Sequence, residues 1–346
     1  MNLTLADIRN ALAERDGNRS FLMARRDEVR LSDDGRLVTS GGRHALSDKS
    51  RVWLARQAGI PVHFFRELSA DLQAVLFNRL FPLSASARKL PDELRVSLQG
   101  EVVVGFSGGQ FPLLSNLKVL EAALDTAPPG LKENENAFEV GHFELNGRFG
   151  LSLVSRDLSA EPRVGDVVRA GIDIDHSDAG ERGTQISSYF LRLVCRNGML
   201  ARVCEHGEAL RVRRGGPESH ESVLNRIRHL AGLAWTDLSG GLRLLRVLSQ
   251  ETVDDPEAVL EKIIRDHGLA PSRKFLRQLL QALSQDELGN GGTLYDVLNA
   301  ISRVGTHSAS RPLAWRRCLL FASGEILRER FERCPQCRSI LRRHRT

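Results

Sequence analysis

Two carboxylates and an imidazole stand close together in the stretch GIDIDHSDAGE. If the two isoleucines point into a core, Asp173 and Asp175 share the opposite face of a β-strand, because side chains alternate along a strand. Together with His176, they could hold Mg²⁺ or Mn²⁺ for the cleavage of phosphodiester bonds. The alternative is a strand that runs into a polar turn, since Asp, Ser and Gly are common turn residues. Asp173, Asp175 and His176 are thus the catalytic candidates of the sequence.

The motif CPQC has the spacing of one half of a zinc site. Its thiols belong to Cys334 and Cys337, and His344 and Cys318 are available as further ligands. The sequence holds no second CxxC motif, so the alternative is a pair of free thiols. A redox role fits less well, because no strand leads into the motif as a thioredoxin-like pattern requires. The sequence therefore makes no cofactor certain, and a structural zinc ion is the possibility that this motif adds.

Arginine is concentrated in two segments of the chain. Residues 192–214 hold six arginines against two glutamates, and residues 325–346 hold seven against three. The net charge of the whole chain is only +6, so the remainder is mildly acidic. The planar arginine fork suits phosphate oxygens and stacks on bases, whereas the alternative is an ordinary solvated basic face. The predicted nucleic-acid-binding residues are Arg192, Arg196, Arg202, Arg211, Arg213 and Arg214.

The stretch YFLRLVCRNGML indicates a strand, a reversal and a returning strand. Asn197 and Gly198 both tolerate positive φ, so we expect them to form the turn. Cys195 falls on the apolar face of the first strand, and a buried free cysteine behaves as a small apolar residue. We therefore interpret the cysteine and the turn as structural, with Arg192 aligned with Arg202 on the returning strand.

The composition is that of an ordinary globular protein, with 346 residues of which 41% are apolar and 27% charged. No apolar run approaches the roughly 20 residues that span a bilayer. The N-terminus lacks the basic start and long apolar centre of a secretion signal. We expect a cytoplasmic protein that does not enter a membrane. The five cysteines are odd in number and, in a reducing compartment, do not predict a disulfide framework.

Three segments differ in the periodicity of their apolar residues. Residues 1–90 predict an N-terminal α/β segment with a helical pair joined at the turn AGIP. Residues 91–215 alternate as antiparallel strands do, around one helix. Residues 216–346 predict helices, beginning with 219–235 and 240–250, and end in the arginine-rich CxxC tail. The expected fold class is α+β, with a central antiparallel β-sheet and packed helices, followed by an all-helical C-terminal region.

Several of these stretches resemble the phage/plasmid-like family of domains of unknown function. The block RLVCRNGM, with the strand and glycine turn before it, is similar to the characteristic block of that family, although Arg196 stands where Thr is common. The N-terminal helical pair of that family is similar to ALSDKSRVWLARQAGIPVHFFRELSADL. Its segment after the first hairpin is similar to GQFPLLSNLKVLEAAL. Its C-terminal helices are similar to TLYDVLNAISRVGTHSASRPLAWRRCLLFASGEIL. The resemblance covers residues 40–330 and implies a gene of a phage, plasmid or integrative element. It implies no catalytic residue.

Together these features favour a nucleic-acid-binding accessory protein of a mobile element. Protection or annealing of single-stranded DNA during recombination is the expected role, through salt-sensitive contacts and as a homo-oligomer. One alternative is a metal-dependent nuclease or phosphodiesterase that uses the three catalytic candidates. Another is a module whose C-terminal helices bind a host protein, for example to block a defence system. We expect binding rather than catalysis, with the question of an enzyme left open.

Overall fold

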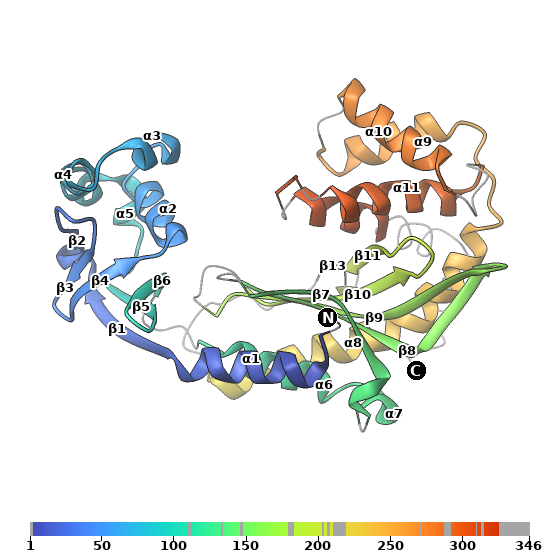
Figure 1. Ribbon diagram of the computed structural model, residues 1–346, viewed down its shortest axis with the longest axis horizontal. Helices are drawn as coiled ribbons and strands as arrows, with labels where there is room; N and C mark the ends of the chain where they lie inside the picture. The colour runs from blue at the N-terminus through green and yellow to red at the C-terminus, as the bar shows by residue number, and fades with distance from the viewer. Residues whose placement is uncertain are drawn as a thin grey trace.

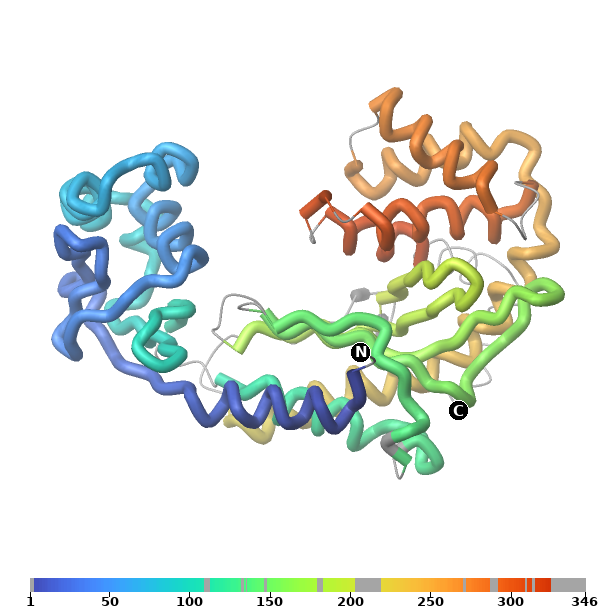
Figure 2. Tube along the Cα trace, in the orientation of Figure 1, coloured from blue at the N-terminus to red at the C-terminus, as the bar shows by residue number. Residues whose placement is uncertain are grey.

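The protein is described here from a computed structural model (Figure 1). The described residues are 3–108, 113–132, 134–145, 148–178, 183–202, 204–205, 208–209, 219–269, 272–286, 292–308, 310–312 and 315–324. Within these ranges the chain forms an N-terminal unit, a body built on a five-stranded sheet, and a helical unit. The N-terminal unit lies beyond one end of the body, and the helical unit stands above the other end (Figure 1, Figure 2).

The N-terminal unit, residues 19–108, is built on a six-stranded sheet in the order β1-β5-β6-β4-β3-β2. All its neighbouring strands are antiparallel except β4 and β6. Its helices pack on one face of the sheet, and one apolar core lies between them. Its elements are β1 (Arg19–Arg25), η1 (Arg26–Glu28), β2 (Arg30–Leu31), β3 (Leu37–Thr39), β4 (Gly42–Leu46), α2 (Asp48–Gln57), α3 (Val62–Glu67), α4 (Ala70–Leu80), η2 (Phe81–Leu83), α5 (Ala85–Arg88), β5 (Glu93–Gln99) and β6 (Val102–Gly108).

The predicted helical pair is confirmed as α2 and α3. Ser47 caps α2, because its hydroxyl accepts a hydrogen bond from the backbone N–H of Ser50. Gly59 takes a φ of +73° in the AGIP turn, a conformation that glycine adopts without steric cost. Trp53 of α2 then stacks on Phe106 of β6, with 4.4 Å between ring centres. The pair is thus held against its own sheet by apolar packing.

The predicted boundary at residue 90 is wrong. β5 pairs with β1 along its whole length, and Val96 of β5 is buried in the core of the N-terminal unit. The unit therefore extends to residue 108. The first helix, α1 (Leu5–Gly17), instead packs on the body through Ile8 and Leu12, so the chain enters the body before it builds the N-terminal unit.

The body is an antiparallel sheet in the order β11-β10-β9-β8-β7, so each strand lies beside its neighbour in sequence. The helices α1, α6 and α8 cover one face, and the shared apolar core includes Ile172, Ile174 and Phe190 (Figure 1). Its other elements are α6 (Asn116–Leu124), α7 (Pro129–Lys132), η3 (Glu135–Ala137), β7 (Phe138–Leu145), β8 (Phe149–Arg163), β9 (Asp166–His176), β10 (Gln185–Arg192), β11 (Asn197–Arg202), β12 (Cys204–Glu205), β13 (Glu208–Ala209) and α8 (His220–Leu248).

One long helix, α8, replaces the two helices predicted at 219–235 and 240–250. The glycine pair at 240–241 suggested a break, but the helix continues through it. A Cβ added to Gly241 would lie 2.3 Å from Cζ of Phe190, so glycine is needed there for helix and sheet to approach. Because α8 shares the core of the body, the C-terminal region is not a separate helical domain.

The helical unit consists of α9 (Pro256–Asp266), α10 (Arg273–Ser284), α11 (Leu294–His307) and the helix at 315–324. A separate apolar core holds these helices together. Helix α11 packs on β11, and Phe321 of the last helix joins a small apolar cluster on the sheet face opposite α8. The α+β class with an antiparallel sheet is confirmed. No helix in the described part of the chain combines the length and apolar character that a membrane span requires.

Candidate functional site

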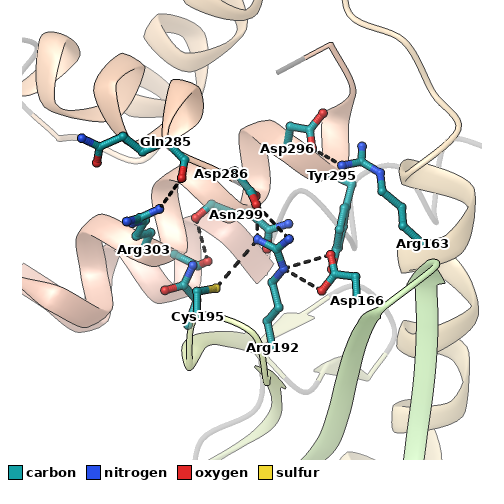
Figure 3. A network of polar contacts seen from close by, with 12 residues as sticks. Arg163, Asp166, Arg192, Cys195, Gln285, Asp286, Tyr295, Asp296, Asn299 and Arg303 are labelled. Carbon is teal, nitrogen blue, oxygen red and sulfur yellow. Dashed lines mark hydrogen bonds and ion pairs between the residues drawn. The ribbon is translucent and has the colours of Figure 1, made fainter. Parts of the chain in front are cut away.

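Arg192, the first predicted nucleic-acid contact, is buried at the end of β10, with 3% of its side chain exposed. Its Nε donates to both carboxylate oxygens of Asp166, at 2.7 and 2.9 Å. Its Nη1 and Nη2 donate to Asp286, at 2.6 and 3.0 Å (Figure 3). Burial alone would lower the pKa of Arg192, but these hydrogen bonds raise it above its usual value. The prediction for Arg192 is therefore wrong, because internal carboxylates take the donors that a phosphate would need.

The same network joins the body to the helical unit. The hydroxyl of Tyr295, on α11, donates to Asp166 at 3.1 Å. Arg163, at the end of β8, donates to Asp296 (Figure 3). It also donates to Thr293, and reciprocal hydrogen bonds between Thr293 and Asp296 cap α11. The buried charges of Arg192 and its partners thus position two parts of the fold.

The remaining predicted arginines do not form one surface with Arg192. Arg196 is exposed and donates to Glu139 at 2.9 Å. Arg202 lies opposite Ser187 at the far end of the β10–β11 hairpin, with its guanidinium carbon 4.8 Å from the centre of the Phe321 ring. The expected alignment of Arg192 with Arg202 is therefore wrong. The other three, Arg211, Arg213 and Arg214, lie outside the described residues.

The reversal between β10 and β11 occurs earlier than predicted. Residues 193–196 form the turn, and Arg196 has a φ of +52°. Gly198 already belongs to β11, where an added Cβ would lie 2.5 Å from the hydroxyl of Tyr189. Cys195 lies in the turn, and burial raises the pKa of its thiol. A raised thiol pKa disfavours the reactive thiolate, which supports the structural interpretation of this cysteine.

Asp173 and Asp175 do share one face of β9, as predicted, since Ile172 and Ile174 lie in the core on the other. That face is not open, however, because Arg317 forms ion pairs with both carboxylates. Asp173 also accepts a hydrogen bond from Ser152 at 2.7 Å, and Arg148 donates to Asp175. The carboxylates are thus already neutralised by guanidinium groups.

His176 does not join these carboxylates. Its side chain lies on the opposite face of β9, with Nδ1 2.8 Å from Oγ1 of Thr184 and Nε2 3.1 Å from the carbonyl oxygen of Leu114. The prediction of a metal site on Asp173, Asp175 and His176 is therefore wrong. In the described part of the chain, no cluster of three or more His, Cys, Asp or Glu side chains is arranged to hold a metal ion.

The thiols and imidazole of the predicted zinc site, Cys334, Cys337 and His344, lie outside the described residues. Cys318, named as a further ligand, is exposed on the helix at 315–324. The zinc site stays a prediction.

The structure reveals a surface that the sequence interpretation missed, on the edge strand β1. Ala24 lies in the core of the N-terminal unit, so alternation places Arg19, Phe21, Met23 and Arg25 on the outward face. Phe21 is 47% exposed and Met23 is also exposed. The guanidinium carbon of Arg19 lies 4.9 Å from the centre of the Phe21 ring. The sequence gives only a weak signal, because residues 21–24 of RSFLMAR form a continuous apolar run. We call these four residues the β1 surface.

The β1 surface lies in the more basic part of the described chain. Residues 19–108 contain fourteen lysines and arginines against ten acidic residues. Arg25 is exposed and uses Nε and Nη2 to hold both oxygens of Asp27, at 3.1 and 2.9 Å. Its charge is therefore locally balanced.

Arg19 sits at the joint between α1, β1 and the residues after β9. Its Nη1 forms an ion pair with Asp178 at 2.7 Å, and only 5% of its side chain is exposed. Asp178 also contacts Arg15 at 3.3 Å and accepts from Nδ2 of Asn116 at 2.9 Å. Burial alone would raise the pKa of Asp178, but the charges of Arg19 and Arg15 lower it below the usual value. Burial also lowers the pKa of Arg19.

The chain matches no protein-family model, no curated protein and no solved structure with which it was compared.

Proposed function

We propose that this protein binds single-stranded nucleic acid through the β1 surface. The observation that carries the proposal is Phe21, an aromatic side chain half exposed on a sheet face with an arginine beside it. Stacking of a base on an aromatic side chain contributes about 1–3 kcal/mol and tolerates any base. Strand β1, which carries Phe21, pairs with β5 along its whole length, so the backbone under the ring is a rigid support.

Charge supplies the second part of the proposed interaction. The excess of basic residues over 19–108 attracts a polyanion, and the release of its counterions makes the affinity fall as salt rises. We also propose that the same nucleic-acid strand contacts the segment that carries Arg202, Arg211, Arg213 and Arg214. Arg192 and Arg196 are not part of this proposal, because Arg192 is buried against two carboxylates and Arg196 forms an ion pair with Glu139.

The resemblance to the phage/plasmid-like family supports a role on a mobile element. Single-stranded DNA is exposed during recombination of such elements, so protection or annealing of that strand is the proposed task. A homo-oligomer would line up several β1 surfaces along one strand and so add their contacts.

Binding of a fluorescent thirty-nucleotide oligo-dT, measured by anisotropy over a salt series, tests the proposal. We expect Phe21→Ala to weaken binding about tenfold or more, as loss of one stacking contact predicts. Phe64→Ala is the matched control, because Phe64 is 45% exposed in the same unit but lies on α3. We expect Phe64→Ala to bind as the wild type does.

Two results would contradict the proposal. One is the absence of binding at low salt, and the other is an equal loss of affinity in both variants. Manganese-dependent cleavage of the oligonucleotide would instead support an enzyme.

A further inference from the structure

We propose that Nε and Nη2 of the Arg19 guanidinium bind one backbone phosphate of the bound nucleic-acid strand. The Phe21 ring covers these atoms and rotates away when the strand binds. This inference rests on the proposed function and names the part of the ligand that Arg19 binds. It commits to a phosphodiester, which carries one negative charge and two non-bridging oxygens.

The arginine edge formed by Nε and Nη2 is one of the edges that can bind an oxyanion through two oxygens. In two other arginines of the described chain that edge is filled. Arg9 uses it to hold Glu121, at 2.8 and 3.2 Å, and Arg25 holds Asp27 in the same way. In Arg19 both Nε and Nη2 are buried, and no group in the described part of the chain accepts a hydrogen bond from either. A donor pair suited to an oxyanion is thus left without its acceptor.

The edge is held in place from the other side. Nη1 of Arg19 is fixed by Asp178, which Arg15 and the buried Asn116 hold in turn. The guanidinium therefore does not turn to pair its remaining donors, because that would break a buried ion pair. A group that is fixed before the ligand arrives loses little conformational entropy on binding.

The charge at the joint also suits a monoanion. Two guanidinium groups, from Arg15 and Arg19, contact the single carboxylate of Asp178. Asp16 also lies nearby, and burial raises the pKa of its carboxyl. The ion pairs at the joint connect two guanidinium groups to one carboxylate, so this arrangement favours a monoanion and would repel a metal cation.

Phe21 provides the route to the buried edge. It is two residues from Arg19 on the same strand face, and its ring lies over the guanidinium. An exposed side chain changes rotamer in picoseconds to nanoseconds, so its rotation uncovers the edge. A base stacked on the rotated ring would bring its own phosphate within reach of Arg19. One nucleotide would then engage both residues.

The test compares Arg19→Gln with Arg25→Gln in the oligo-dT salt series. The two arginines share a strand and a face, but only the edge of Arg25 is filled by a carboxylate. We expect Arg19→Gln to lower the slope of log K against log salt by about 0.7, the value for one phosphate contact on a single strand. Arg25→Gln should leave the slope unchanged.

Arg19→Lys is the second variant, because it keeps a charge for Asp178 and so guards against misfolding. An ammonium group lacks the two parallel donors, so we expect severalfold weaker binding with an unchanged thermal unfolding midpoint. Wild-type affinity in Arg19→Lys, or equal slopes in the two glutamine variants, would overturn the inference while oligo-dT binding by the wild type still stands. If the wild type does not bind oligo-dT, the proposed function fails and this inference fails with it.

Discussion

Arg192 and Arg19 are both almost completely buried, yet their surroundings differ. Arg192 donates to two carboxylates, Asp166 and Asp286, and every donor nitrogen of its guanidinium has an acceptor. Arg19 contacts one carboxylate, which it shares with Arg15, and two of its donor nitrogens have none within the described chain. The first arrangement holds two parts of the fold together, whereas the second leaves a donor pair for a ligand.

This difference shows why the density of arginine along a sequence is a poor guide to a binding surface. In the described part of the segment 192–214, Arg192 and Arg196 are matched by carboxylates that come from distant parts of the chain. Asp286, for example, lies 94 positions beyond Arg192. Local charge counts do not contain such partners, so the function of an arginine depends on its pairing in the fold.

The largest predicted effect is on the Arg192 side of the comparison. Arg192→Met removes the guanidinium and leaves Asp166 and Asp286 buried without their cation. We expect the free energy of unfolding to fall by about 3–5 kcal/mol, as when one partner of a buried ion pair is lost. Urea denaturation followed by circular dichroism measures this change.

Arg196→Ala is the control for that experiment. Its ion pair with Glu139 is exposed on the arginine side, and such pairs contribute about 0–1 kcal/mol. A loss below about 1 kcal/mol in Arg192→Met would show that the buried network does not stabilise the fold. The contrast with Arg19 would then disappear.

Much of the fold was predictable from local patterns. Alternation in the body placed Asp173 and Asp175 on one face of β9, and Ser47 and Gly59 gave the limits of α2. The boundary at residue 90 failed because strand pairing between β1 and β5 is a long-range contact. The break predicted near Gly241 failed because packing against Phe190 outweighs the intrinsic cost of glycine in a helix, about 1 kcal/mol.

The candidate site was less predictable, for a related physical reason. Alternation shows which residues share a face but not what covers that face, so the cover of Arg317 over Asp173 was not foreseen. The β1 surface had only a weak local signal, since one side of RSFLMAR places Phe21 and Met23 between Arg19 and Arg25. The sequence near Arg19 did not show whether its donors were paired, because its partner Asp178 follows β9, far along the chain.

The second prediction concerns Asp178, on the Arg19 side of the comparison. Asp178→Asn keeps the shape of the side chain but removes the charge between Arg15 and Arg19. At pH 7 we expect the free energy of unfolding to fall by about 1.5–3 kcal/mol, the usual contribution of hydrogen bonds to a charged group. Because the pKa of Asp178 is lowered in the folded state, the carboxylate stabilises the fold fully above its unfolded value of about 3.9.

The pH dependence sharpens this test. The stabilisation by Asp178 should disappear as the pH falls through the lowered folded-state pKa, since both states then bind the proton. The wild type and Asp178→Asn should therefore differ at pH 7 and converge in strong acid when unfolding is measured in urea. A difference that stays constant over this range would mean that the charge of Asp178 does not hold the joint.

The smallest predicted effect is on stability at Phe21. Its ring is half exposed, so Phe21→Ala removes little buried apolar area, and we expect a loss of about 1 kcal/mol or less. Phe190→Ala is the matched contrast, because that ring is fully buried between β10 and α8 and its removal should cost about 3–5 kcal/mol. Thermal unfolding of the two variants gives both values.

A large destabilisation by Phe21→Ala would mean that the ring is part of the structural support of Arg19, and a loss of DNA binding in that variant would then no longer indicate stacking. Small destabilisation together with lost binding would assign the ring to the ligand.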